Sequence, residues 1–344
     1  MGIQTHFDKF HDKIKLGQKD DAYKKARERD DSISGDVKDA FKEAGYPVVT
    51  EFIQGSLATS TAVVPIDGDY DIDRALVIDA DSAPDNPVDP KIETLEVMES
   101  RGFKNAKIKK PCVTADYTSD SVHIDFIIYK KSGEQHYLAV GKKNSDENNP
   151  DWAIADPLGL IDWINDTSGY GEDADEIRAQ FRRLVRYLKR WRDSQFSEAV
   201  VAKVYSIGLT VMAKEQLQWS FNTEGFRQDL IALRCTVSRM LDATYFRNEE
   251  NDQYRVSVFL PKEPWRDIFD GSSLDTGTQF RNKLQHLKDK LIQVEDLTDE
   301  RKQCEILNKL FGDDFVVPDP PKSESQTSKA VYSTAGVVGT SQGG

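Results

Sequence analysis

The chain has 344 residues, 38% of them hydrophobic and 31% charged, and this length predicts two lobes with real cores. Its formal net charge of −13 disfavours a nucleic-acid template or activator, because proteins that grip a phosphate backbone usually carry a basic patch. Three widely spaced cysteines, Cys112, Cys235 and Cys304, argue against a disulfide framework or a cysteine-rich zinc site. With no signal-peptide pattern and no run of about 20 apolar residues, we expect a cytoplasmic protein without a membrane partner.

The first 157 residues predict helices around a small mixed sheet. Apolar residues at helical spacing predict a helical stretch at residues 4–44. The next predicted helix, 88–102, ends at Gly102. Period-two patterns predict four strands, the first of which ends in a Gly-Ser turn. These strands are 48–56, 70–79, 107–118 and 121–130.

After Pro157 the pattern becomes helical. The predicted helices are 172–193, 198–217, 225–246, 276–294 and 298–310, the last with Thr298 as its N-cap. The segment PKEPWRDIF at 261–269 interrupts this series. From Pro318 the chain is rich in Pro, Ser, Thr and Gly without an amphipathic period, which predicts a flexible tail.

Asp71 and Asp73 are the first candidate site residues. Residues two apart in a strand share a face, so the two carboxylates would stand side by side while Ile72 points into the core. Adjacent carboxylates repel each other unless a cation lies between them, and carboxylate oxygens suit Mg²⁺ or Mn²⁺. Taken alone, the pair favours an exposed edge strand with two solvated aspartates, because this spacing is common.

Two further features strengthen this interpretation. Gly55-Ser56 closes the preceding strand, where glycine lets the backbone approach a ligand and the serine can hold a phosphate. Asp125 lies in the apolar strand VHIDFIIY, and a carboxylate there needs a partner, which a metal shared with Asp71 and Asp73 would supply. His123 lies on the same face, where an ordinary polar neighbour is the better interpretation.

A basic helix, FRRLVRYLKRWRDS at 181–194, carries the fourth feature. Its Lys189, together with Ser206 near the start of the next helical run, would suit a triphosphate. For Arg190 and Arg192 we favour a solvated helix face.

In this order, the motifs resemble the polymerase beta-like nucleotidyltransferase superfamily. The segments QGSLATSTAVVPIDGDYDID, VHIDFIIY, DWAIADPLGLIDWI, LVRYLKRW and LFGDDF resemble one branch of it. That branch is the cyclic GMP-AMP synthase/DncV-like nucleotidyltransferases of bacterial anti-phage (CBASS) systems. The resemblance runs from about residue 4 to residue 315 and implies an α+β, two-lobed fold.

The resemblance also implies roles for single residues. Asp71, Asp73 and Asp125 would be the catalytic triad that binds two Mg²⁺ or Mn²⁺ ions. Donor phosphates would be held by Gln54, Gly55, Ser56, Lys189 and Ser206, with Arg186 as a rival to Lys189. Asp69 extends the acidic run on the same face, but the family pattern places the pair at the last two aspartates of that run.

The implied organisation has four parts. An N-terminal helical segment at 1–45 packs across both lobes, a palm domain with a mixed sheet spans 46–157, a helical domain spans 158–317, and the tail covers 318–344. The implied substrates are NTPs, ATP among them, with no nucleic-acid template. The chain ends in Gly-Gly, and the resemblance implies accessory regulators, including a ubiquitin-ligase-like protein that conjugates this end.

The expected activity is synthesis of a cyclic di- or trinucleotide second messenger by metal-assisted nucleotidyl transfer (EC 2.7.7). Two alternatives remain open at this point. One is a different nucleotidyltransferase of the superfamily that modifies RNA, a small molecule or a protein. The other is a non-catalytic nucleotide-binding module.

Overall fold

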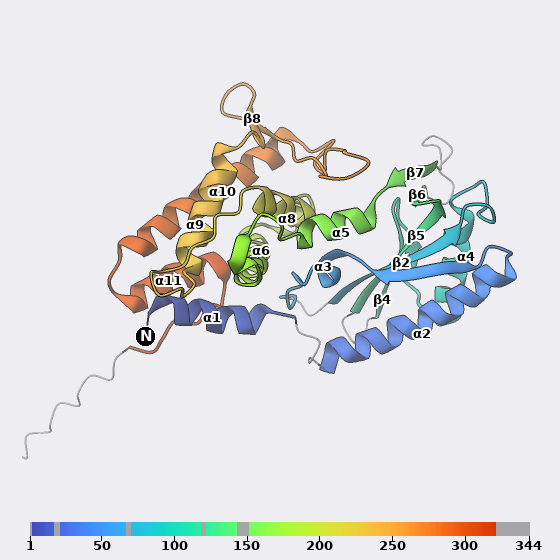
Figure 1. Cartoon of the computed structure of the whole chain (residues 1–344), viewed down its shortest axis with the longest axis horizontal. Helices are drawn as coiled ribbons and strands as arrows, with labels where there is room; N and C mark the ends of the chain where they lie inside the picture. Colours follow the sequence, from blue (N-terminus) through green and yellow to red (C-terminus); the bar gives the residue numbers. More distant parts are fainter. Residues whose placement is uncertain (1, 17–20, 67–69, 118–121, 143–150, 321–344) are drawn as a thin grey trace, which may run out of the picture.

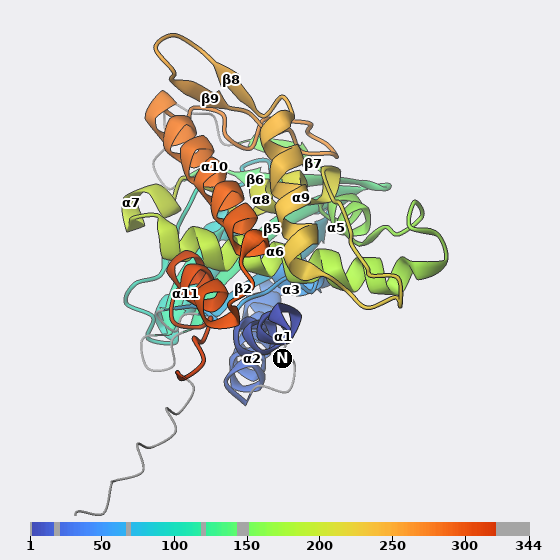
Figure 2. The ribbon, with the colours of Figure 1, turned by 90° about the vertical axis from the view of Figure 1, so that its left-hand side faces the viewer.

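The computed structural model describes residues 2–16, 21–66, 70–117, 122–142 and 151–320. A mixed sheet with two covering helices forms one part of the molecule and a group of helices forms the other, and α5 (Pro157–Asn165) leads from one to the other (Figure 1). The view turned by 90° shows the helical part in front of the sheet (Figure 2). This mixture of helices and sheet agrees with the predicted α+β class.

The sheet is built around two parallel central strands, β2 (Tyr70–Asp79) and β5 (Val122–Ser132). On the outer side of β2 lies the antiparallel strand β1 (Val48–Ile53). The other side of β5 is shared, because β4 (Val113–Tyr117) pairs with its first half and β6 (Gln135–Val140) with its second. The short β3 (Lys107–Ile108) extends β4, and β7 (Asp151–Ala155) extends β6.

Two helices cover one face of the sheet. These are α2 (Asp21–Glu43) and α4 (Asp89–Ser100), which bury Phe41 and Met98 against Ile72 of β2 and Phe126 of β5. Alternate residues of a strand face opposite sides, so the neighbours of Ile72 in sequence, Asp71 and Asp73, lie on the other face. That face has a smaller apolar cluster, which includes Val77 and Tyr129.

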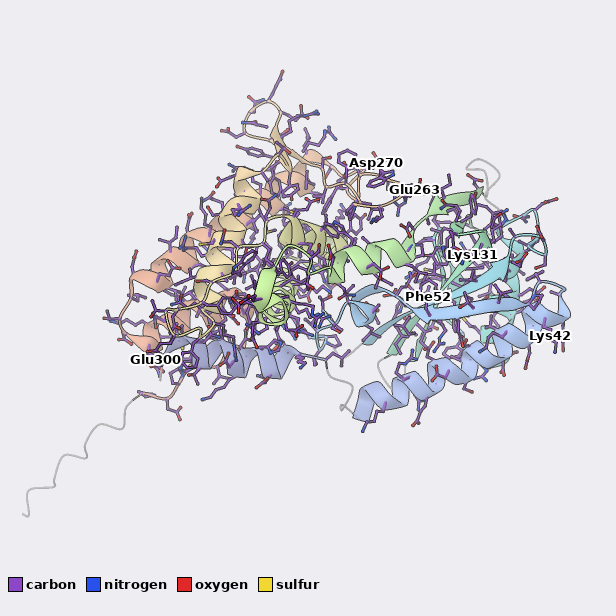
Figure 3. All side chains as sticks on the ribbon, in the orientation of Figure 1. Lys42, Phe52, Lys131, Glu263, Asp270 and Glu300 are labelled. Atoms are coloured by element: carbon purple, nitrogen blue, oxygen red, sulfur yellow. The ribbon has the colours of Figure 1, made fainter. Side chains whose placement is uncertain are left out.

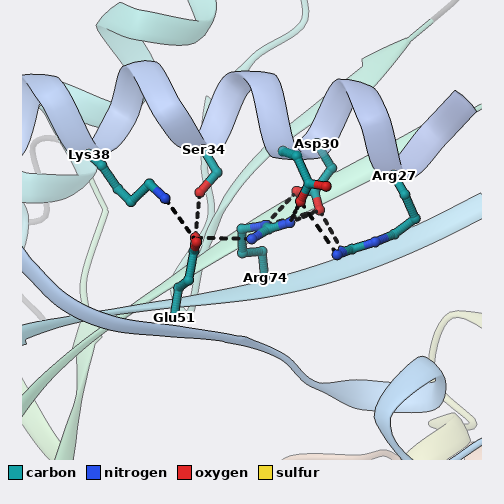
Figure 4. Close-up of polar contacts among 7 residues, drawn as sticks. Arg27, Asp30, Ser34, Lys38, Glu51 and Arg74 are labelled. Carbon is teal, nitrogen blue, oxygen red and sulfur yellow. Dashed lines mark hydrogen bonds and ion pairs between the residues drawn. The ribbon is translucent and has the colours of Figure 1, made fainter. Parts of the chain in front are cut away.

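A network of ion pairs fixes α2 to the strand that carries Asp71 and Asp73 (Figure 4). The guanidinium of Arg74, 4% exposed, donates to Asp30 and Asp31 of α2 and to Glu51 of β1. Burial opposes the charge on Arg74, but the hydrogen bonds to Asp30 outweigh it and raise the pKa of the guanidinium. The network is completed by Arg27, Ser34 and Lys38.

The helical part has its own apolar core, which spans Phe7 and Phe10 of α1 (Ile3–Ile14) and Trp191 of α6 (Ala174–Gln195). Around α6 lie α8 (Ser206–Glu215), α9 (Asp229–Asp242), α10 (Leu274–Asp296) and α11 (Glu300–Phe311). A hairpin, β8 (Phe246–Asn248) and β9 (Tyr254–Val256), leads into the loop that carries Glu263 and Asp270 (Figure 3). This loop reaches the start of α5, where Asp156 N donates to Glu263 O at 3.2 Å.

Several predicted elements need correction. The helical stretch at 4–44 consists of two helices, α1 in the helical core and α2 on the sheet. The strand predicted at 107–118 is broken at Pro111, and the helix at 198–217 is split into α7 (Glu198–Val201) and α8. The Gly-Ser turn is the start of a one-turn helix, α3 (Gly55–Ala58).

The remaining differences concern helix ends and missed elements. The N-cap of α11 is Asp299, whose carboxylate accepts from Lys302 N at 3.1 Å, and Thr298 lies before it. The sequence also did not predict β6, β7 and α5. Within the described ranges, no helix combines the length and apolar composition needed to cross a membrane.

Candidate active site

The parallel pairing of β2 with β5 brings the predicted aspartates together. Asp73 lies directly opposite Asp125 in the register, and Asp71 lies one pleat away on the same face of β2. The face on which the aspartates lie follows from the sequence, because Ile72 and Ile124 are buried on the opposite face and fix which side each strand presents.

Gly55 packs against the Asp73 carboxylate. Its φ of +64° is in the left-handed region, and a Cβ atom there would lie 2.1 Å from Asp73 Oδ2. The preceding amide, Gln54 N, donates to Asp73 O at 2.9 Å. Only glycine tolerates both the backbone conformation and this approach, so the residue type is required by the carboxylate beside it.

The pKa values of Asp73 and Asp125 are shifted in opposite directions. Burial, followed by the charges of Asp71 and Asp125, raises the pKa of Asp73 to about 6. Burial also disfavours the charged form of Asp125, but the His123 and Thr114 side chains outweigh it and lower the pKa of Asp125.

His123 is held beside Asp125 by its own partners. Its Nδ1 is bonded to Asp116 Oδ1, and its Nε2 lies 2.7 Å from Thr114 Oγ1 and 3.1 Å from Asp125 Oδ1. That last contact has ion-pair distance but is not a hydrogen bond, and Asp125 Oδ1 is buried without a hydrogen-bond partner. Lys109 Nζ lies 3.8 Å from the same oxygen, so Asp125 Oδ1 has two ion-pair contacts.

This donor set fits a hard divalent cation. The carboxylates come from two adjacent strands and offer hard oxygen ligands, and the raised pKa of Asp73 reflects burial and nearby negative charge that Mg²⁺ or Mn²⁺ would neutralise. In the part of the chain that the structure describes, no three acidic, histidine or cysteine side chains already form a metal-binding cluster.

A cavity of about 530 Å³ lies between this face of the sheet and the helical part. Asp71 and Asp73 line it, whereas Asp125, beside Asp73, is not among the described lining residues. The predicted phosphate-binding residues also line it, namely Gln54, Gly55, Ser56, Lys189 and Ser206. Asp69 and most of the tail lie outside the described residues.

The basic residues of α6 do not form a solvated face. Arg190 is 2% exposed, donates to Val64 O and pairs with Asp314, and Arg192 lines the cavity and donates to Ser206 Oγ. Our interpretation of Arg190 and Arg192 from the sequence is therefore wrong. Helical spacing alone could not reveal the backbone carbonyls that these side chains reach, because those belong to a distant segment.

Lys189 and Arg186 differ in what they contact. Lys189 Nζ donates to Thr61 O at 3.1 Å, and burial, with the charges of Arg192 and Arg186, lowers its pKa to about 7. Arg186 instead binds the carbonyls of Ser60 and Ala62 and is not among the described lining residues. Of the two rivals, only Lys189 reaches the cavity.

Sequence reasoning missed several lining residues. Tyr129 lies four residues beyond Asp125 in the predicted strand, and this same-face spacing was a usable signal. An apolar wall comes from the unpredicted β6, β7 and α5, with Leu138, Ile154 and Leu160 as examples. Glu263 and Arg266 come from the irregular loop at 257–270, where periodicity gives no signal.

The comparison with protein families matches the part of the chain that carries the aspartates. Residues 49–129 match a model described as the nucleotidyltransferase domain of cyclic GMP-AMP synthase DncV-like proteins. Among curated proteins, a cyclic GMP-AMP synthase of Escherichia albertii is 29% identical over 235 residues, which cover 64% of this chain and 49% of that protein. The chain therefore spans about half the length of this curated relative.

Solved structures share the whole fold. The Bradyrhizobium diazoefficiens CD-NTase CdnG in complex with GTP has a TM-score of 0.67 at 15% identity, covering 92% of this chain and 96% of that chain. The 3′-deoxy GTP-bound DncV of Escherichia coli has a TM-score of 0.65 at 16% identity, covering 88% and 93%. The Vibrio cholerae DncV in complex with the linear intermediate 5′ pppA(3′,5′)pG has a TM-score of 0.59 at 18% identity, covering 77% and 69%. Residues 49–129 thus match the DncV-like nucleotidyltransferase domain model, and the chain shares its fold with these CD-NTase structures.

Proposed function

We propose that the protein is a nucleotidyltransferase that joins NTPs into a cyclic di- or trinucleotide. The observation that carries this proposal is the meeting of Asp73 with Asp125 and with Gly55 at one side of a cavity large enough for a nucleotide. Acidic and basic groups face each other there, since Lys189 and Arg192 line the same cavity as Asp71 and Asp73. A triphosphate needs both kinds of group, the bases directly and the acids through cations.

Asp71, Asp73 and Asp125 would hold the divalent ions, two in the expected arrangement. When bound, such ions neutralise triphosphate charge and lower the pKa of an attacking hydroxyl. Asp125, opposite Asp73 in the register, is the group that would accept the proton of the attacking ribose hydroxyl.

The chain's own residues would orient the donor nucleotide. Ser56 and the α3 backbone contact its phosphates at the Asp73 end of the cavity, while Lys189 and Ser206 contact the leaving pyrophosphate from α6 and α8. The Arg192 guanidinium fixes Ser206 Oγ by a hydrogen bond at 2.5 Å. With the donor so held, the ribose oxygen of an acceptor attacks the α-phosphorus in line, the new P–O bond forms and the bond to pyrophosphate breaks.

The relatives support purine nucleotides as substrates. GTP is bound in the CdnG structure and a linear product of ATP and GTP composition in the DncV structure, so we propose ATP and GTP as the first substrates to test. We further propose that the product acts as a cytoplasmic second messenger in anti-phage defence. A CdnC relative is in complex with a HORMA protein, which supports an accessory regulator here too. Conjugation of the Gly-Gly end by a ubiquitin-ligase-like protein remains a prediction from the sequence.

Mass spectrometry of reaction products tests the proposal. Purified protein is incubated with Mg²⁺ and each of the four NTPs, singly and in pairs. We expect a cyclic oligonucleotide together with pyrophosphate. A nucleotide transferred only to added RNA, a small molecule or a protein would indicate another nucleotidyltransferase, and binding without any product would indicate a non-catalytic module.

A further inference from the structure

Tyr129 is a buried residue of the cavity that the mechanism above does not use. It lies on β5, four residues beyond Asp125 and on the same face, and its side chain is 5% exposed. Its hydroxyl donates to Gln54 Oε1 at 3.1 Å, which joins β5 to the segment before α3. Both residues line the cavity.

Neighbouring rings hold the phenol in place. Phe52 of β1 lies nearly parallel to it, with ring centroids 6.4 Å apart and an interplanar angle of 22°. His136 of β6 meets it edge-on, at 6.2 Å and 86°. Burial raises the pKa of Tyr129, so the hydroxyl keeps its proton at neutral pH and remains a donor.

This contact decides which end of the Gln54 amide is available. The Gln54 backbone is fixed by its bond to Asp73 O, and its Oε1 is engaged by Tyr129. Within the described ranges, Gln54 Nε2 makes no hydrogen bond with the protein, so its two N–H donors remain for a ligand. Because Gln54 adjoins Gly55 and Asp73, the nearest part of a bound nucleotide is its phosphate end.

We propose that Tyr129 is a positioning residue, which holds the Gln54 amide with Nε2 directed at a phosphate oxygen of the bound NTP. Without the phenol hydroxyl, the amide loses its preset orientation, and its oxygen can also face the phosphate. An amide oxygen cannot donate to a phosphate and repels it instead. The inference rests on the proposed nucleotidyltransferase function and names a further residue of the same site.

The first test compares Tyr129→Phe with Tyr245→Phe. The control residue is 8% exposed and donates its hydroxyl to Glu215, but it does not line the cavity. Steady-state pyrophosphate release with ATP and with GTP is measured for wild type and both variants. We expect Tyr129→Phe to raise KM about fivefold to tenfold with kcat within about twofold, since one aligned hydrogen bond is lost in ground and transition state alike. Tyr245→Phe should leave both constants unchanged.

The second test asks whether Tyr129 acts through Gln54. Gln54→Ala should raise KM, and adding Tyr129→Phe to it should change KM by less than about twofold, because no amide remains to be oriented. An equal KM increase in both backgrounds would show that Tyr129 contacts the nucleotide directly and would overturn the inference. So would a Tyr129→Phe enzyme with the wild-type KM. If wild type itself forms no pyrophosphate from any NTP, the proposed function fails and the inference falls with it.

Discussion

At the scale of single residues, the site depends on how closely groups approach each other. Gly55 and Asp73 illustrate this, since the space that a side chain at 55 would need is taken by the carboxylate. The sequence predicted both residues for the site but not their contact. Residue spacing along a strand predicts which face of the sheet each side chain lies on. It does not predict how closely α3 approaches β2, which depends on the conformation of the segment that links them.

Alanine substitutions at two glycines distinguish the effect of this contact on activity from the effect of backbone strain. We expect Gly55→Ala to lower turnover at least tenfold, because the new Cβ displaces the Asp73 carboxylate. Gly133→Ala is the matched control, since Gly133 has a similar φ of +56° but nothing within 4 Å of its would-be Cβ. Both variants should lose a comparable amount of stability, about 1–2 kcal/mol. Equal activities of the two variants would contradict the role of the contact.

At the scale of elements, α6 holds the segment that follows α3. Arg186, Lys189 and Arg190 donate to the carbonyls of residues 60, 61, 62 and 64. The helix itself, its apolar stripe and its charge could be predicted from sequence. Its polar partners could not, because they lie more than 120 residues away and offer backbone atoms, which carry no sequence signal.

Arg186→Met tests this attachment. The variant keeps the apolar stem but leaves two carbonyls without their donor, so we expect a loss of about 2–4 kcal/mol in the free energy of unfolding, measured by urea denaturation. Arg178→Met on the same helix removes only an exposed pair with Asp175 and should cost less than about 0.5 kcal/mol. Similar small losses in the free energy of unfolding for both variants would show that the carbonyl contacts contribute little to stability.

At the scale of the whole molecule, α1 and α6 join the two parts of the chain through their contacts with residues 60–64. His11 of α1 lies beside these contacts. His11 Nε2 lies 3.0 Å from Arg186 Nη1, and the end of α1 accepts from Val64 N at 2.8 Å. Composition and patterning predicted the two parts and their helices. The contacts between them could not be predicted, since they depend on how the loops at 60–64 and 257–270 fold back, and neither loop has a regular period.

His11 should make stability depend on pH. Burial, followed by the charges of Arg186, Arg183 and Lys15, lowers its pKa to about 3, against the opposing charge of Asp229. Because the unfolded chain takes up this proton below its ordinary pKa of 6.5, stability contributed by His11 falls as the pH drops from 6.5 towards 3. Between pH 7 and pH 5 the expected loss is about 2 kcal/mol.

A non-titrating variant isolates this contribution. Asp73, with its pKa raised to about 6, adds about 1 kcal/mol of stability over the same interval and offsets part of the His11 loss, so the comparison is made against His11→Gln. Urea denaturation at pH 7 and pH 5 should show a larger loss for wild type than for His11→Gln. Parallel losses in the two proteins would contradict the assignment of a neutral, buried His11.

Pyrophosphate release by the Asp71→Ala, Asp73→Ala double variant tests the central claim most directly. Its control is the double variant Asp79→Ala, Asp81→Ala, which removes two exposed aspartates of the same spacing at the other end of β2. We predict that the first variant forms no product from ATP, GTP or their mixture, yet unfolds at a urea concentration no lower than wild type, because removing charges that repel each other does not weaken the fold. The control should retain wild-type turnover. Full turnover by a folded Asp71→Ala, Asp73→Ala protein would contradict nucleotidyl transfer at this site.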